Sequence, residues 1–149
     1  MNKQIYSVLL ADDDDDDCIF FKEALDELSL PVKLVTVNDG VELMGFLKAN
    51  ISGSLPDILF LDLNMPRKNG YECLTEIKEI EEMKGLSVVI FSTSQDSEIV
   101  NLMYEKGAVF YIRKPGDFSK LKKVIGEALA KASENNFKQP AREQFILQP

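Results

Sequence analysis

The sequence predicts an α/β fold in which five parallel strands form one sheet that is covered by helices on both faces. Short apolar or β-branched runs alternate five times with segments whose apolar residues recur at helical spacing. This alternation is typical of a doubly wound sheet, because right-handed crossovers return each strand parallel to the last. The length of 149 residues and the 45% hydrophobic content suit one domain with a packed core.

The first four elements are predicted from local composition. Residues 6–11 form an apolar run that ends at a series of aspartates, as expected of a buried parallel strand. Apolar residues between 21 and 28 keep helical spacing, and Pro31 ends that helix. Residues 32–37 are β-branched and alternating, which indicates the second strand, and residues 41–48 carry one apolar helical face.

The later elements follow the same pattern, with a polar residue near the end of each strand. Strands are predicted at 57–61, 86–91 and 108–112, and helices are predicted around the apolar positions 73–80, 99–103 and 121–129. Gly107 is expected to cap the fourth helix.

The last residues lack a core pattern. We therefore expect a domain over residues 1–131 and an extension over 132–149 that has no output domain and frays. An alternative is that Phe137 and residues 145–147 dock on this domain or on a partner.

Composition excludes several classes of function. The formal net charge of −8 disfavours nucleic acid and anionic membranes as partners. The absence of histidine removes histidine-based triads, histidine-ligated zinc and a phosphohistidine carrier role. Cys18 and Cys73 are expected to be free thiols in a reducing cytoplasm. The chain has neither a long apolar run nor a signal-peptide pattern, so no membrane span is expected.

Polar residues at the predicted strand ends form the candidate site. Asp12 and Asp13 end the first strand, Asp62 the third and Ser92 the fourth, and Lys114 follows the fifth. The carboxyl ends of parallel strands meet at one edge, where ligands of such sheets bind. Clustered carboxylates repel one another, so a hard divalent cation with oxygen ligands, Mg²⁺, is expected among them. A carboxylate beside Mg²⁺ and an ammonium can accept an activated phosphoryl group.

Several short motifs together resemble the response-regulator receiver family: Leu9–Asp14, Leu61–Pro66 with Asn69–Gly70, Phe91–Ser92, Gly107–Ala108 and Tyr111–Pro115. The resemblance covers about residues 4–131. It implies a flavodoxin-like three-layer sandwich with strand order 2-1-3-4-5, like that of stand-alone chemotaxis regulators. It also implies two-component phosphorelay signalling in which a histidine kinase or a phosphotransfer protein is the donor.

The resemblance implies a role for each strand-end carboxylate. Asp62 is implied to be the phosphoacceptor. Asp13 and Asp62 are implied to hold Mg²⁺, with Asp12 as a direct or water-mediated ligand and the backbone carbonyl of Asn64 completing the set. The protein would then signal by phosphorylation-dependent binding to an unknown downstream protein or by onward relay. It would be a monomer or weak homodimer and no enzyme beyond slow self-phosphorylation and self-dephosphorylation.

Further roles are implied at the fourth and fifth strands. Lys114 is implied to pair with Asp62 and then with the phosphoryl group, and its bond to Pro115 is expected to be cis. Ser92, which stands where threonine is commoner in the family, is implied to be the switch hydroxyl. Tyr111 is implied to be the aromatic that turns inward with it, although packing on the sheet edge is the alternative.

Other interpretations of the same residues remain open. Asp14–Asp17 are expected to be a solvated acidic loop, with Asp17 suited to the start of the next helix. The spacing also resembles a calcium loop, but Asp17 stands where such a loop needs glycine. An aspartyl-nucleophile phosphatase of the haloacid dehalogenase type usually has a second aspartate where this chain has Asn64. A receiver-like adaptor that is never phosphorylated is disfavoured by the complete set of site residues.

Overall fold

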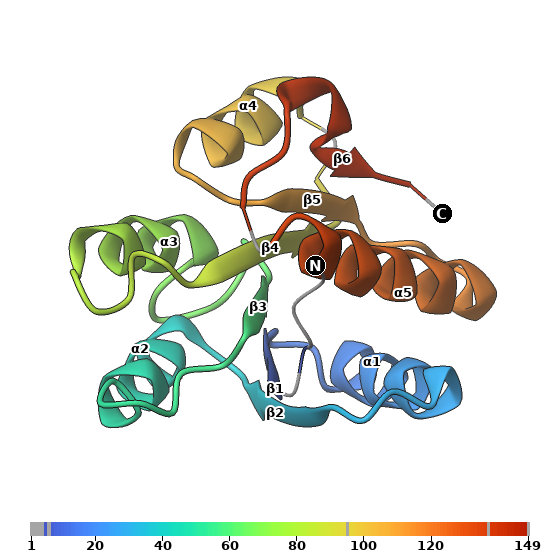
Figure 1. The fold of residues 1–149 in the computed structure, drawn as a ribbon, viewed down its shortest axis with the longest axis horizontal. Helices are drawn as coiled ribbons and strands as arrows, with labels where there is room; N and C mark the ends of the chain where they lie inside the picture. Colours follow the sequence, from blue (N-terminus) through green and yellow to red (C-terminus); the bar gives the residue numbers. More distant parts are fainter. Residues whose placement is uncertain (1–4, 6, 95, 137, 149) are drawn as a thin grey trace.

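The computed structural model describes residues 5, 7–94, 96–136 and 138–148 and shows a flavodoxin-like α/β fold. Its sheet has the strand order β2-β1-β3-β4-β5-β6, and every neighbouring pair is parallel. Figure 1 shows the sheet between two layers of helices. The alternation of strands and helices that the sequence predicts is therefore confirmed.

The elements lie close to their predicted positions. The strands are β1 (Ser7–Ala11), β2 (Lys33–Val37), β3 (Ile58–Leu61), β4 (Ser87–Ser92), β5 (Phe110–Arg113) and β6 (Ile146–Leu147). The helices are α1 (Asp15–Leu28), α2 (Gly40–Ala49), α3 (Gly70–Glu79), α4 (Ser97–Glu105), α5 (Phe118–Glu134) and the short 3₁₀ helix η1 (Arg142–Gln144).

The two faces of the sheet bury separate apolar clusters. Leu9 and Ala11 of β1 face the layer of α2, α3 and α4, whereas Val8 and Leu10 face α1 and α5 (Figure 1). This division follows from the strand's period of two, which sends successive side chains to opposite faces. Among the described residues, no helix combines the length and apolarity needed to cross a membrane.

Each α-helix begins at an aspartate or asparagine whose side chain accepts backbone N–H groups of the first turn. These capping residues are Asp14, Asp39, Asn69, Asp96 and Asp117. Such caps satisfy N–H groups that have no partner within the helix. The caps of α1, α2, α4 and α5 follow closely after strand ends, so they also help to shape the loops at that edge of the sheet.

The C-terminal residues differ from the expectation of a frayed extension. The prediction of five strands was wrong, because Ile146 and Leu147 form a sixth strand that pairs with Tyr111 and Ile112 of β5. In addition, α5 continues to Glu134, past the expected boundary at residue 131. Sequence analysis recognises strands and helices by the periodic recurrence of apolar residues, and a strand of two residues is too short to show such a period.

Phe145 anchors this C-terminal segment, residues 138–148. Its side chain is fully buried, and its ring packs edge-on against Tyr104 and Tyr111 at centroid distances of 5.0 and 6.3 Å. Gln139 Nε2 donates to the backbone oxygens of Tyr104 and Ala108, each at 2.7 Å. The alternative that residues 145–147 dock on the domain is thus confirmed, while Phe137 lies outside the described residues.

The substitution Phe145→Ala is expected to lower the free energy of unfolding by about 3 kcal/mol, because it removes a buried ring that packs against Tyr104 and Tyr111 and leaves a cavity. Urea unfolding followed by circular dichroism measures this change. Gln144→Ala is the matched control, since this exposed neighbour should change stability by less than about 0.5 kcal/mol. Equal stability of the two variants would contradict docking of the C-terminal segment.

Candidate functional site

Backbone hydrogen bonds bring the strand-end residues together. The N–H of Asp12 donates to Val37 O at 3.0 Å, and the N–H of Asp62 donates to Ala11 O at 2.9 Å. The N–H of Lys114 donates to Ser92 O at 2.9 Å. Each bond extends a parallel ladder by one residue beyond its strand. The register of the sheet therefore sets these side chains at one edge.

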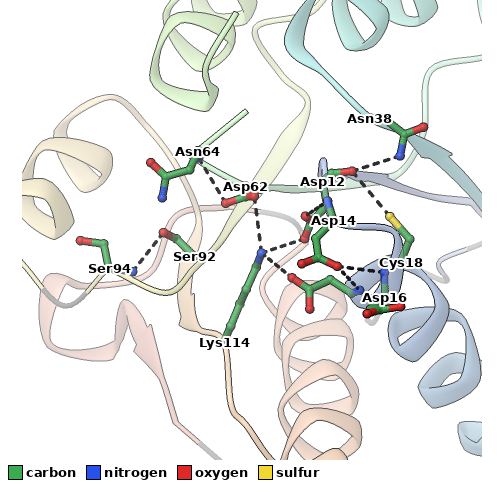
Figure 2. Close-up of polar contacts among 11 residues, drawn as sticks. Asp12, Asp14, Asp16, Cys18, Asn38, Asp62, Asn64, Ser92, Ser94 and Lys114 are labelled. Carbon is green, nitrogen blue, oxygen red and sulfur yellow. Dashed lines mark hydrogen bonds and ion pairs between the residues drawn. The ribbon is translucent and has the colours of Figure 1, made fainter. Parts of the chain in front are cut away.

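Short side-chain turns orient the polar groups at this edge. Asp12 Oδ1 accepts the N–H of Asp14 at 3.0 Å, and Asp62 Oδ1 accepts the N–H of Asn64 at 3.2 Å. Ser92 Oγ likewise accepts the N–H of Ser94 at 3.2 Å. Figure 2 shows these contacts, with Ser92 and Asp12 on opposite sides of Asp62. One oxygen of Asp12 and one of Asp62 are thus restrained, and the other oxygen of each faces Lys114.

The ammonium of Lys114 lies at the centre of the carboxylates (Figure 2). Its Nζ is 2.8 Å from Asp12 Oδ2, 3.0 Å from Asp17 Oδ2 and 3.4 Å from Asp62 Oδ2. The lysine side chain is only 11% exposed and lies over the ring of Phe91 at 5.3 Å. The low exposure strengthens these ion pairs relative to pairs at the protein surface.

Three carboxylates form a group with the donor set of a metal site. One oxygen from each of Asp12, Asp13 and Asp62 lies within 4.8 Å of the others, with Asp13 exposed and the other two buried. Asp12 Oδ2 is buried and ion-paired, but it has no hydrogen-bond partner among the described residues. The all-oxygen donor set of these three carboxylates fits a hard divalent cation such as Mg²⁺ or Mn²⁺.

Burial and charge determine the protonation equilibria of the site. Burial, reinforced by the charge of Asp12, raises the pKa of Asp62 to about 6 despite the opposing effect of Lys114. Burial also raises the pKa of Asp12. Burial alone would lower the pKa of Lys114, but the carboxylates of Asp12, Asp62 and Asp17 raise it overall. The ammonium therefore stays charged while two buried carboxylates are destabilised.

Glycine is required where α3 begins. A Cβ atom on Gly70 would lie 2.3 Å from the backbone oxygen of Asp62 and 2.8 Å from the Cα of Leu63, closer than these atoms can approach. The N–H of Gly70 donates to Leu63 O at 3.0 Å. The missing side chain thus lets α3 pack directly against the backbone that carries Asp62.

The other predicted residues lie at or near the same edge. Asn64 is exposed in the loop after Asp62, and Ser92 is fully buried at the end of β4. Tyr111 is also fully buried, and its hydroxyl donates to Ser94 O at 3.1 Å. Tyr111 is thus directed inward and in contact with the loop after β4.

Sequence reasoning missed the contact between Asp17 and Lys114, because it assigned Asp17 to a solvated loop. It also missed Asn38 Nδ2 and Cys18 Sγ, which contact the backbone oxygen of Asp12 at 3.3 and 3.6 Å. Asp17 lies 97 positions from Lys114 in sequence, so no local pattern connects the two residues. The acidic run at residues 12–17 indicated that carboxylates gather near the site, but six identical aspartates gave no means of choosing Asp17 among them.

One further expectation is corrected by the structure, and one disfavoured alternative is excluded. The Lys114–Pro115 bond is trans, since the described residues contain no cis peptide bond. Trans is the preferred isomer, and Lys114 reaches Asp62 without the cis form. Residues 15–28 form helix α1, which excludes the calcium-loop interpretation of the acidic run.

Comparison with known proteins identifies the family. Residues 8–126 match the response regulator receiver domain. The response regulator Rcp1 of Synechocystis is 31% identical over 121 residues, which cover 79% of this chain and 82% of Rcp1. The chain belongs to the receiver family, whose members act in two-component phosphorelay signalling and are phosphorylated on an aspartate.

Solved structures give the same result. The phosphorylated cyanobacterial phytochrome response regulator RcpA superposes with a TM-score of 0.78 at 31% identity and covers 93% of this chain and 100% of its own. The Mn²⁺-bound form of Rcp1 also has a TM-score of 0.78, at 29% identity, and covers 91% and 99%. The similarity thus extends over most of the chain.

The raised pKa of Asp62 predicts a pH-dependent stability of the metal-free protein. The folded state binds a proton at this group more tightly than the unfolded chain, whose aspartate pKa is near 3.8. The free energy of unfolding should therefore fall as pH rises from about 4 to about 6. Asp62→Asn should reduce this fall, leaving the contribution of Asp12, and stabilise the protein by about 1–3 kcal/mol at pH 7.

Urea unfolding of the metal-free protein at several pH values measures this effect. Asp16→Asn is the control, because this exposed aspartate of α1 is on the same acidic run and should change stability by less than about 0.5 kcal/mol. If Asp62→Asn were no more stable than Asp16→Asn at pH 7, the site would not hold a destabilised carboxylate.

Proposed function

We propose that Asp62 is the phosphoacceptor of this receiver, with a histidine kinase or phosphotransfer protein as the donor. The observation that carries this proposal is the position of Asp62, beside an ammonium at 3.4 Å and within the carboxylate cluster at the sheet edge. In the reaction an oxygen of Asp62 attacks phosphorus, and the phosphorus–nitrogen bond of the donor phosphohistidine breaks. The imidazole leaves with the bonding electron pair and takes up a proton.

Asp12, Asp13, Asp62 and the backbone carbonyl of Asn64 are proposed to hold Mg²⁺. When bound, the cation neutralises the carboxylates and the oxygens of the incoming phosphoryl group. Lys114 supplies a second positive charge, and Ser92 can donate its hydroxyl to a phosphoryl oxygen. Asp12 and Asp62 are only 0% and 4% exposed, so water would screen the positive charges of the cation and of Lys114 only weakly at these carboxylates.

The protein is proposed to act stoichiometrically rather than as an enzyme with turnover, apart from slow self-phosphorylation and self-dephosphorylation. The loop residue Asn64 stands where an aspartyl-nucleophile phosphatase usually has its second aspartate, so no carboxylate is available there to promote rapid hydrolysis. We place the exchange with the donor in the cytoplasm. Because RcpA is a phytochrome response regulator, the histidine kinase of a phytochrome is the first donor to test.

Intact mass measurement after incubation with phosphoramidate and Mg²⁺ should show one added phosphoryl group. Asp62→Asn should show none, and Asp57→Asn, which alters the aspartate immediately before β3, is the control that should still be modified. Chelation of the metal should slow the reaction at least about tenfold, because the repulsion between anions is then uncompensated. Modification of Asp62→Asn would reassign the acceptor, rapid turnover of a phosphomonoester would indicate a phosphatase, and no adduct on the native protein would indicate an adaptor.

The output is proposed to pass through Tyr111 to the C-terminal segment. The Tyr111 hydroxyl holds the loop after Ser92, while the Tyr111 N–H donates to Phe145 O at 3.0 Å. A rearrangement of Ser92 around a phosphoryl group would therefore reach residues 138–148 through one buried side chain. Residues 132–149 are thus proposed to belong to the receiver as part of its surface for a downstream protein, with the protein itself a monomer or weak homodimer.

Phosphorylation should change amide hydrogen exchange in residues 138–148 as well as in the loop after β4. The population of the docked segment shifts because the two states differ in their contacts at Tyr111. Tyr111→Ala should abolish the change in the segment while leaving phosphorylation of Asp62 detectable. Helix α2, which is on the opposite flank of the sheet, provides the internal reference. An unchanged segment in the phosphorylated native protein would contradict this route.

A further inference from the structure

Asp17 makes a contact that the strand-end residues do not make. Its Oδ2 accepts a hydrogen bond from Lys114 Nζ at 3.0 Å. The same ammonium is 2.8 Å from Asp12 Oδ2, and its distance to Asp62 Oδ2 is the longest, at 3.4 Å. The lysine is therefore shared between the strand-end carboxylates and Asp17, a residue outside the strand-end set.

The start of α1 holds Asp17 in this position. Asp14 caps the helix, and its side chain accepts the N–H groups of Asp16 and Asp17 at 2.9 and 3.2 Å. The side chain of Asp17 is 36% exposed, whereas that of Lys114 is 11% exposed. The lysine is thus enclosed by the site, while its partner comes from the solvent side on an adjacent helix.

The hydrogen bond between Asp17 and Lys114 lies in a site with an excess of negative charge. Asp12, Asp62 and Asp17 lie around one ammonium, and Asp13 is close to Asp12 and Asp62, so Asp17 adds to an existing negative excess. An acyl phosphate adds roughly −1.5 to −2 charge, by analogy with other phosphorylated side chains. Lys114 must turn toward that phosphoryl group, so the hydrogen bond to Asp17 opposes the movement. The same hydrogen bond draws the ammonium away from Asp62, where it would compete with a divalent cation.

We propose that Asp17 is a positioning residue that restrains Lys114 and thereby slows phosphoryl acceptance while strengthening cation binding. The inference deepens the proposed function of Asp62 and rests on it for the phosphoryl step alone. The two effects have opposite signs, because the phosphoryl group is an anion that needs the lysine and the metal is a cation that competes with it. If Asp17 contributed only to folding, it would not slow phosphoryl acceptance and strengthen cation binding at the same time.

Asp17→Asn should accept phosphoryl groups from phosphoramidate about two- to fivefold faster at saturating Mg²⁺. The same variant should bind Mg²⁺ about two- to fivefold more weakly by calorimetry, because the released lysine moves toward Asp62. Asp16→Asn removes one exposed charge from the same helical turn and should change both quantities less. Asp17→Glu, which retains the carboxylate, should behave like the native protein, and Asp17→Ser serves as a second neutral variant if Asp17→Asn is poorly folded.

A double-mutant cycle with Lys114→Gln tests the effect of Asp17 on Mg²⁺ affinity without any phosphorylation step. Without the lysine, Asp17→Asn should weaken Mg²⁺ binding no more than Asp16→Asn does. If the native protein accepts no phosphoryl group but the cycle shows coupling, the restraint on Lys114 stands and the phosphoacceptor function fails. If Asp17→Asn matches Asp16→Asn in rate and in Mg²⁺ affinity with the lysine present, the inference is overturned.

Discussion

The structure depends on the balance between buried carboxylates and a single ammonium at one edge of the sheet. Asp12 and Asp62 are almost fully buried, and burial destabilises their charged forms. Lys114 relieves only part of the repulsion, since it faces three carboxylates within 3.4 Å. The folded protein therefore keeps an unfavourable charge cluster that a cation would relieve. The same cluster makes the edge suitable for receiving a phosphoryl group together with a metal.

The parallel sheet maintains this cluster through its backbone. Hydrogen bonds beyond the strand ends place Asp62 beside Ala11 and Lys114 beside Ser92, so the positions follow from register and not from side-chain attraction. Gly70 allows α3 to approach the backbone of Asp62 closely. Repulsion between the carboxylates is consequently opposed by the packing of the whole domain, which explains how the charges remain close together.

The C-terminal segment extends the sheet beyond β5. It covers β5 with a short sixth strand and fills the space beside Tyr104 and Tyr111 with Phe145. An uncovered edge strand would leave backbone groups unpaired. The surface formed by α4, β5 and this segment therefore differs from that of a five-stranded receiver, although Tyr111 still connects it to the loop after Ser92.

The sequence by itself determined the alternation of strands and helices and the strand-end positions of Asp12, Asp62 and Lys114, because period and composition are local signals. Only the tertiary structure decided that Ile146 and Leu147 form a strand, since two residues have no period and their docking depends on contacts with distant aromatic rings. It likewise selected Asp17 from a run of identical residues, because the orientation of α1 relative to Lys114 arises only when the layers pack.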